Sequence, residues 1–221
     1  MKLGELLAII RRDELDDESQ PYLWSNAALI EYAEDAENEA CRRASLLRDA
    51  TTPAICRITL VAGTSEYDLD PRVIRLRRVR LTGNSTPLVP VTTAQLDEEH
   101  PGWEDETGEP SCYLTDWETG EIRVVPTPTA VGTLELQVVR LPLVALNDME
   151  DTPEIHARFH RDLRHWIVKR AFSVLDSERQ DKDRAKDAES RFALAFGDPL
   201  SARTEEWNAR NLPSTHRDGS E

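Results

Sequence analysis

The sequence predicts an α+β fold: a four-helix bundle formed by the N- and C-terminal helices, an inserted antiparallel β-sandwich or barrel module, and an extended C-terminal tail. Apolar residues recur with a helical period before Pro53 and after Asp151, and with a period of two between these points. After Gly197 only scattered apolar residues remain. We therefore expect bundle segments at 1–53 and 151–197, a β-module at 54–150 and a tail at 198–221.

Two helices are expected before Pro53. The first is a short amphipathic helix with Leu3, Leu6, Leu7 and Ile10 on one face, followed by an acidic loop. Ser25 is a natural N-cap for a second helix that runs to about Arg48. The inner stripe of this helix is rich in alanine, so another helix can approach closely.

The sequence of the middle of the chain predicts a series of strands separated by glycine-containing turns. The predicted strands are Ile55–Leu60, Glu66–Leu69, Val73–Leu81, Leu88–Val91, Cys112–Thr115, Glu121–Val125 and Thr133–Leu141. In the strand Val73–Leu81, Ile74 and Leu76 are out of phase with Val79 and Leu81. A β-bulge near Arg77-Arg78 would return both pairs to the core. Thr92–Glu99 is expected to form one helical turn.

The stretch Thr152–Leu175 is expected to be the central helix of the bundle. Thr152 can cap it and Pro153 suits its first turn. Its apolar stripe contains the expected core anchors Phe159, Leu163, Trp166 and Ile167. A last helix follows at about Lys182–Phe196, and Gly197 fits the position after its end. In the tail, Trp207 and Leu212 are the potential anchors.

Composition limits the classes of function. The chain has 221 residues, 27 basic and 42 acidic side chains and a net charge of −15. The excess of acidic side chains argues against a protein that binds nucleic acid over a broad surface. It suits a surface that nucleic acid passes without binding. Three cysteines without CxxC spacing favour free thiols in a reducing compartment. The first residues match neither a signal peptide nor a membrane span, so we expect a protein of the cytosol.

Motifs for catalysis, metal binding or cofactor binding are missing from the sequence. It contains no GxSxG, P-loop or GxGxxG pattern. His156 and His160 have a spacing that two metal ligands on one helix can use, but His165 lies on another face and no further ligand completes a site. We therefore expect no catalytic residues, no metal and no cofactor.

One rival interpretation is an enzyme. The carboxylates of the acidic loop, with Trp103 and Trp117 as an aromatic platform, would suit a glycan-acting hydrolase or a carbohydrate-binding protein. Aromatic residues in a β-module are more often core or interface anchors, and a solvated acidic loop is the more common structure.

The charge distribution is more informative. Five arginines fall within nine residues, and ten acids without a basic residue follow between Asp97 and Glu121. The candidates for a subunit interface are Arg75, Arg77, Arg78, Arg80, Glu104, Asp105 and Glu106. The two blocks could neutralise each other within one chain, or they could pair between neighbouring copies in a ring.

Several short segments, in this order and spacing, carry a resemblance to a known family. They are Trp24-Ser25, Ala62–Asp70, Pro101-Gly102-Trp103, Gly108–Tyr113, Val124–Pro128, Leu141-Pro142-Leu143, Pro153-Glu154-Ile155 and Phe159-His160. Together they resemble bacteriophage head-to-tail adaptor, or connector, proteins of the tail tubular A-like family of short-tailed phages. Asp70-Pro71 departs from the Leu-Pro that is common there, and the tail after Gly197 has no counterpart.

The resemblance implies a non-enzymatic structural protein of the virion, made in the host cytoplasm and located where the capsid vertex meets the tail. It implies a homo-oligomeric ring, expected to be dodecameric. The ring would dock on the portal protein and connect it to the tail nozzle or tail tube protein. DNA would pass the lumen without specific binding, and no membrane would be involved. An acidic lumen would repel phosphate. Trp207 and Leu212 are the candidates for portal binding.

Overall fold

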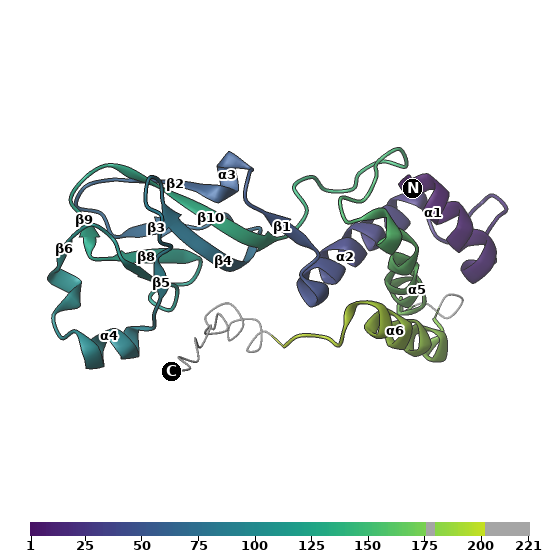
Figure 1. Cartoon of the computed structure of the whole chain (residues 1–221). Coiled ribbons are helices and arrows are strands. Elements are labelled where there is room, and N and C mark those ends of the chain that lie inside the picture. Colours follow the sequence, from purple (N-terminus) through teal and green to yellow (C-terminus); the bar gives the residue numbers. More distant parts are fainter. Residues whose placement is uncertain (176–179, 202–221) are drawn as a thin grey trace, which may run out of the picture. The chain divides into compact units, whose positions relative to one another are not determined.

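The computed structural model describes residues 1–175 and 180–201, and its fold is α+β, as predicted. The chain divides into two compact units (Figure 1). Unit 1 contains Met1–Leu47 and Leu141–Leu200, and unit 2 contains Arg48–Arg140. Unit 1 is helical, whereas unit 2 is built mainly from strands. The chain therefore enters unit 2 once and leaves it once.

Unit 1 combines helices from both ends of the described chain. Its elements are α1 (Leu3–Ile10), a π-helical turn (Arg11–Leu15), α2 (Asn26–Ala44), a 3-10 helix (Ala157–Asp162), α5 (Leu163–Phe172) and α6 (Lys182–Phe196). The expected cap of α2 is confirmed, because the Ser25 hydroxyl accepts a hydrogen bond from the Ala28 N–H at 3.2 Å. Asp181 caps α6 in the same way.

Helix α5 lies at the centre of unit 1 and packs against α1, α2 and α6. The buried apolar residues of the four helices include Leu3, Leu6, Leu7, Ile10, Leu29, Ala33, Ala36, Ala40, Leu163, Ile167, Ala171 and Phe192. Three of the α2 residues are alanines on one face, as the sequence predicts. Small side chains let the helix axes approach closely, which brings more atoms into van der Waals contact.

A buried ion pair holds the loop between α1 and α2. Arg11 and Asp17 are both less than a tenth exposed and bond each other directly. Arg11 also donates to the Trp24 carbonyl at 2.7 Å, and Asp17 accepts the Leu23 N–H at 2.8 Å. Both charges are therefore satisfied by several partners, which is the condition for burying an ion pair.

The predicted start of the central helix is wrong. Helical structure begins at Ala157, with His156 as the capping residue, instead of at Thr152. The Ile155 N–H donates to Glu37 at 3.0 Å, and His160 Nε2 lies 2.8 Å from the Ile155 carbonyl oxygen. Both backbone groups of Ile155 are thus occupied, and the bond to Glu37 is a tertiary contact that the local signals at Thr152 and Pro153 do not report. The helix also ends at Phe172, before the predicted Leu175.

Unit 2 contains two four-stranded sheets and a small two-stranded one. The first sheet contains β1 (Leu47–Asp49), β10 (Gly132–Arg140), β2 (Arg57–Leu60) and β4 (Val73–Leu81). The second has the order β3 (Glu66–Asp68), β8 (Glu121–Val125), β7 (Cys112–Leu114) and β5 (Val89–Pro90). The third pairs β6 (Thr107–Gly108) with β9 (Thr127–Pro128). β5 pairs with β7 in parallel, as does β6 with β9, so the module is not wholly antiparallel as expected.

The predicted bulge in β4 is confirmed. Arg78 faces Gln137 on β10 and Leu76 faces Val138, so Arg77 is the extra residue. A second irregularity places Ile74 between the pairs Arg75–Val139 and Val73–Arg140. Because of the bulge at Arg77, Leu76 and Val79 are both buried.

Two boundaries near Pro53 differ from the prediction. Helix α2 ends at Ala44, where Ser45 adopts a left-handed conformation, and not at Arg48. Pro53–Cys56 forms a helical turn, α3, so the strand expected from Ile55 begins at Arg57. Pro53 suits the first turn of a helix as well as the end of one, which explains the error.

The short helix expected at Thr92–Glu99 is present as α4 (Thr93–Glu99). Thr92 and Gln95 cap it reciprocally. Its Leu96 packs into a cluster with Trp103, Leu114 and Val125. The helix therefore covers part of the second sheet, although its other residues are largely polar.

Candidate interaction surfaces

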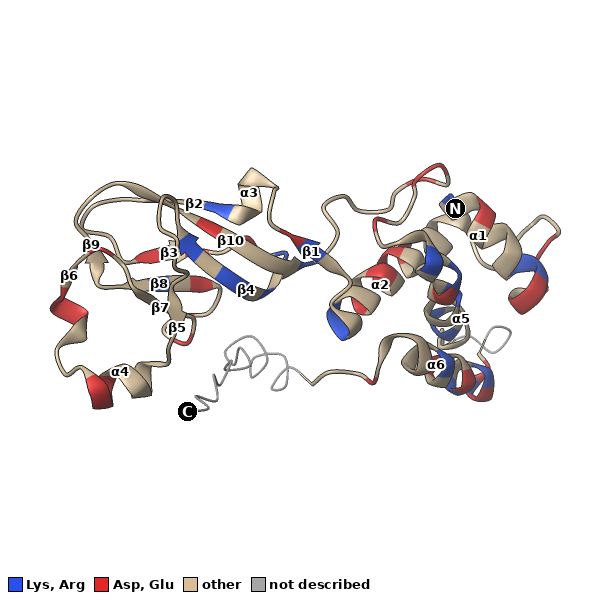
Figure 2. Ribbon diagram, in the orientation of Figure 1, with Lys and Arg blue, Asp and Glu red and all other residues tan. Residues whose placement is uncertain are grey.

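The strand β4 carries a run of basic residues along its length (Figure 2). Arg80 pairs with Glu135 across the β4–β10 ladder, Arg78 with Gln137, and Arg75 with Val139. Cross-strand partners point to the same face. The opposite face carries Val79 and Leu136, which are buried. The strand thus separates a basic outer face from an apolar inner face, while the bulged Arg77 is exposed.

The arginines of this strand differ in their partners. Arg80 Nε donates to Glu135 Oε2 at 3.2 Å, and this hydrogen bond lowers the pKa of Glu135. Arg72, just before the strand, bonds Asp70 and lowers its pKa to about 2. Arg75, Arg77 and Arg78 have no ion-pair partner among residues 1–175 and 180–201. A shallow depression of about 220 Å³, bordered by Arg57, Arg78 and Arg80, lies on this face.

The acidic candidates Glu104, Asp105 and Glu106 lie on and just after a 3-10 helix (Trp103–Asp105) and are exposed. Trp103 anchors this helix, because its ring is buried and its Nε1 donates to Asp97 at 3.0 Å. Within the described part of the chain, no ion pair joins these three carboxylates to the arginines of β4. Direct pairing inside one chain therefore does not neutralise the two blocks there.

Trp103 and Trp117 do not form an open platform for a sugar. Trp103 is only 3% exposed, whereas Trp117 is 39% exposed. The two rings pack edge to face at 5.6 Å, and the Arg123 guanidinium lies 4.8 Å from the first ring and 4.2 Å from the second. Arg123 also bonds Glu66. The pair is thus a structural anchor with one accessible ring, and nothing in this arrangement favours the carbohydrate interpretation.

A second acidic surface lies on strands β3 and β8. Asp68 faces Glu121 directly across the antiparallel pair, and like charges in such positions repel each other. Burial raises the pKa of Glu121, and the neighbouring carboxylates of Glu118, Asp68 and Glu66 raise it further. The sequence places Glu118 and Glu121 in the acidic block Asp97–Glu121, but it does not show that Glu121 faces Asp68.

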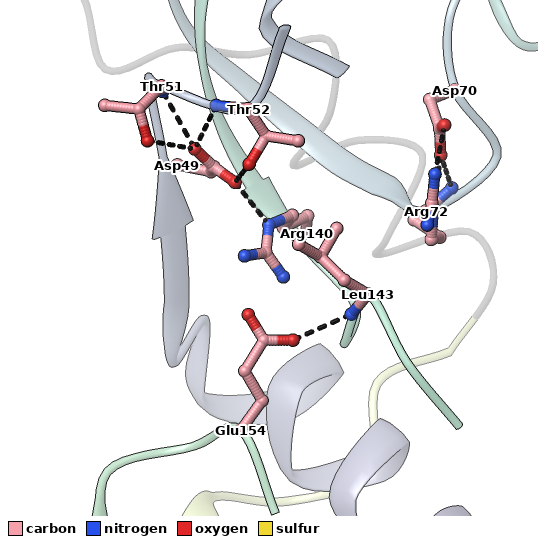
Figure 3. A network of polar contacts seen from close by, with 8 residues as sticks. All are labelled: Asp49, Thr51, Thr52, Asp70, Arg72, Arg140, Leu143 and Glu154. Atoms are coloured by element: carbon pink, nitrogen blue, oxygen red, sulfur yellow. Dashed lines mark hydrogen bonds and ion pairs between the residues drawn. The ribbon is translucent and has the colours of Figure 1, made fainter. Parts of the chain in front are cut away.

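An ion pair fastens the two ends of unit 2. Asp49 lies on β1, next to the point where the chain enters unit 2, and Arg140 lies at the end of β10, where the chain leaves it. Arg140 Nε donates to Asp49 Oδ2 at 2.7 Å, and Asp49 also accepts hydrogen bonds from Thr51 and Thr52 (Figure 3). We call these four residues the Asp49 clasp.

The hydrogen bonds of the Asp49 clasp stabilise the ionised form of the Asp49 carboxylate. Burial alone would raise the pKa of Asp49, but the hydrogen bonds from Thr52, Thr51 and Arg140 outweigh it and hold the pKa well below its usual range. Sequence reasoning missed this site. The signal was the Asp49-x-Thr51-Thr52 pattern, since an Asp side chain commonly bonds the backbone two residues further on.

The expected core anchors of the central helix have different environments. Leu163 and Ile167 are fully buried, whereas Phe159 and Trp166 are only partly buried. The Trp166 ring packs against Phe192 at 5.0 Å, and Lys169 Nζ lies 3.6 Å from its centroid. Trp166 therefore lies at the edge of the core of unit 1 rather than at its centre.

The histidines make structural contacts. His156 caps the 3-10 helix, and His160 is buried and hydrogen-bonded to the backbone of Ile155. Burial lowers the pKa of His165. Within the described ranges, no group of three or more His, Cys, Asp or Glu side chains is arranged to hold a metal ion. None of the helices there combines the length and apolar character that a membrane span needs. The proposed tail anchors Trp207 and Leu212 lie outside the described residues.

Unit 2 thus presents basic and acidic surfaces of its own, and charged surfaces of this kind suit a protein that works by assembling with other proteins. Comparison with known families identifies the class of protein. The family model described as SU10 adaptor protein matches residues 1–214, so the chain belongs to the SU10 adaptor protein family. A search of curated proteins found no match.

Family membership confirms part of what the sequence resemblance implied. The chain is a phage adaptor-type structural protein of the virion, and such a protein interacts with other phage head or tail proteins. The match supports the adaptor class and not the tail tubular A-like family in particular.

Proposed function

We propose that the protein forms a ring that docks on the portal protein and connects it to the tail nozzle or tail tube protein. The ring is dodecameric, and DNA passes through its lumen without specific binding. The observation that carries this proposal is the pair of opposite surfaces on unit 2. Arg75, Arg77 and Arg78 lack ion-pair partners in the described chain, and so do the exposed Glu104, Asp105 and Glu106. A contact that joins unlike surfaces of identical copies repeats around a closed ring.

The net charge of −15 supports the proposed lumen. A wall that is negative on average repels phosphate, so DNA can slide past it without adhering. Non-enzymatic action fits the adaptor family and the structural role of Trp103. In this proposal the tail, with Trp207 and Leu212 as anchors, locks the docked ring in a groove on the portal or between neighbouring subunits.

The test is negative-stain electron microscopy of the full chain mixed with its cognate portal protein. We expect rings stacked coaxially on the portal, and native mass spectrometry should give twelve copies per ring. Monomers that never bind the portal, at any ratio of the two proteins, would show that the chain is not a portal-docking ring.

A further inference from the structure

A groove in unit 2 opens beside the first half of β4. It has a volume of about 630 Å³ and lies between the start of β4 and the hairpin that joins β7 to β8. Leu69, Val73 and Ile74 line it and are half-buried, so they leave apolar surface for a partner. A concave site of this size can receive a few side chains of a partner segment.

Trp117 provides a fixed aromatic surface on one side of this groove. Its ring is held by Trp103 and Arg123, yet 39% of the residue is exposed. A side chain that is already held in place loses little conformational entropy when a partner packs on it. Trp117 can therefore receive an apolar side chain at low cost.

The groove is acidic on balance. Asp116, Glu118 and Glu121 line it, and Arg75 is the basic residue at its border. Asp116 is already engaged, because it accepts hydrogen bonds from the Thr93 N–H at 3.0 Å and the Thr93 hydroxyl at 3.1 Å. Glu118 and Glu121 make no ion pair within the described ranges, and Asp68 adds a further negative charge opposite Glu121. Basic groups in the groove would relieve this repulsion.

One segment of the chain has the complementary composition. Residues 207–217, outside the described part of the structure, contain Arg210, His216 and Arg217 and no carboxylate, in a chain with a net charge of −15. The same segment carries Trp207 and Leu212. It therefore combines positive charge with apolar side chains, as the occupant of this groove must.

We propose that the groove receives residues Trp207–Arg217 of a neighbouring copy, so that each tail fastens one copy to the next. This inference rests on the proposed ring and names the receptor for its tail. Each copy has one groove and one tail, so the exchange continues around a closed ring and leaves neither unoccupied. The apolar side chains fill the groove beside Trp117, and the arginines approach Glu118 and Glu121.

The first test is peptide binding to the full chain. The receptor carries Trp207→Ala, Arg210→Glu and Arg217→Glu, so that its own tail cannot compete, and the probe is a fluorescein-labelled peptide of residues 207–217. Fluorescence anisotropy at low salt should show saturable binding. Adding Glu118→Lys and Glu121→Lys to the receptor should weaken it at least about tenfold. The matched control, Glu98→Lys with Glu99→Lys on exposed residues of α4, should leave the affinity unchanged. Absent binding, or equal loss with the control, overturns the proposal.

The second test shows whether the tail binds a neighbour. A full-length groove variant (Glu118→Lys, Glu121→Lys) and a full-length tail variant (Arg210→Glu, Arg217→Glu) should each self-associate more weakly than the natural chain. Their mixture should form a one-to-one complex in sedimentation velocity, and a chain with all four changes should recover association. Peptide binding without a mixed complex would mean that each tail occupies its own groove, which overturns the assignment to a neighbour.

The adaptor function is judged separately on the portal. Rings that assemble equally well from the natural chain and from both variants would overturn the groove proposal and leave the adaptor function standing. The same holds if the labelled peptide binds purified portal protein but not the groove. Failure of the natural chain to form rings on the portal would instead remove the proposed function.

Discussion

Glu37 is the most unusual titratable group of unit 1. It lies on α2, is 2% exposed and accepts the Ile155 N–H at 3.0 Å. Burial raises its pKa from 4.5 to about 7, although the backbone hydrogen bonds oppose the rise and the carboxylates of Glu154 and Glu34 add to it. The folded protein therefore holds this proton at pH values where the unfolded chain has released it.

The stability contributed by this group should fall as the pH rises. Below pH 4.5 the carboxyl is protonated in both states, and between 4.5 and about 7 only the folded state keeps the proton. The shift corresponds to roughly 3 kcal/mol of unfolding free energy lost by pH 8. Glu37→Gln keeps an acceptor for Ile155, so the difference in stability between pH 5 and pH 8 should shrink by about that amount. Urea unfolding at the two pH values measures it, with Glu31→Gln, on an exposed site of the same helix, as the control.

Trp166 should contribute less to stability than a residue at the centre of the core. It is partly exposed and makes ring contacts with Phe192 and Lys169, whereas Leu163 is fully buried. Leu163→Ala should cost about 2 to 5 kcal/mol, because a buried cavity remains. Trp166→Ala opens a site that water can enter and should cost about 1 to 2 kcal/mol, below the usual range for a buried aromatic residue. Urea unfolding of the two variants compares them directly. An equal or larger loss for Trp166 would mean that its ring supports the core more than its exposure indicates.

At this scale, sequence reasoning succeeded where a residue acts on its close neighbours. Ser25 was identified as a cap because its partner lies three residues away. The Arg140–Asp49 pair, in contrast, joins residues separated by 91 positions. Local sequence patterns carry no information on partners this far apart in the chain. The sequence therefore shows that both charged residues are present, but not that they form an ion pair.

Among the elements, β4, β8 and α6 have the predicted bounds, whereas the central helix begins later and ends earlier than predicted. The phase change within β4 is a property of the strand itself, and only a bulge at Arg77 resolves it. The start of the central helix depends on His160, five residues further along, and on a tertiary contact with Glu37 of α2, both of which bond Ile155. Tertiary contacts of this kind override capping signals.

Limited proteolysis should distinguish the elements. The proposed β-module at 54–150 and the bundle segments on either side should separate by cuts near Pro53, near Asp151 or in the exposed acidic loop between Glu98 and Glu109. Proteases need several residues of accessible backbone, which helix α5 does not offer. Mass spectrometry of early fragments gives the sites. Early cuts inside Leu163–Phe172 would mean that this helix is far less stable than its burial indicates.

For the whole molecule, assembly should depend on salt. If the unpaired arginines of β4 meet the acidic loop of a neighbour, raising ionic strength weakens the ring by screening. Arg77→Glu with Arg78→Glu should lower the fraction of rings at moderate salt, and thermal unfolding of the subunit should change little. Sedimentation velocity from low to high salt measures the fraction. Assembly that is indifferent to both salt and charge reversal would place the subunit contact elsewhere.

The fold class of the whole chain followed from its two hydrophobic periods, because periodicity reports which face of each element is buried. The candidate surfaces could be predicted only in part from the sequence. The arginines of β4 could be assigned to one strand, but the groove beside Trp117 depends on how two segments some forty residues apart approach each other. Strand pairing is a long-range property, and short sequence windows do not contain it.

The Asp49 clasp also has a consequence for the order of folding. Helices α2 and α5 must find each other across all of unit 2, and closing a flexible loop of about ninety residues costs ~4 kcal/mol of chain entropy. If unit 2 folds first, Asp49 and Arg140 hold its entry and exit strands side by side, so the remaining search spans only short connections. Pulse-labelled hydrogen exchange should then protect β10 amides before those of α5. The clasp would act as a starting point for the helical unit, which could not assemble efficiently from its two separated halves.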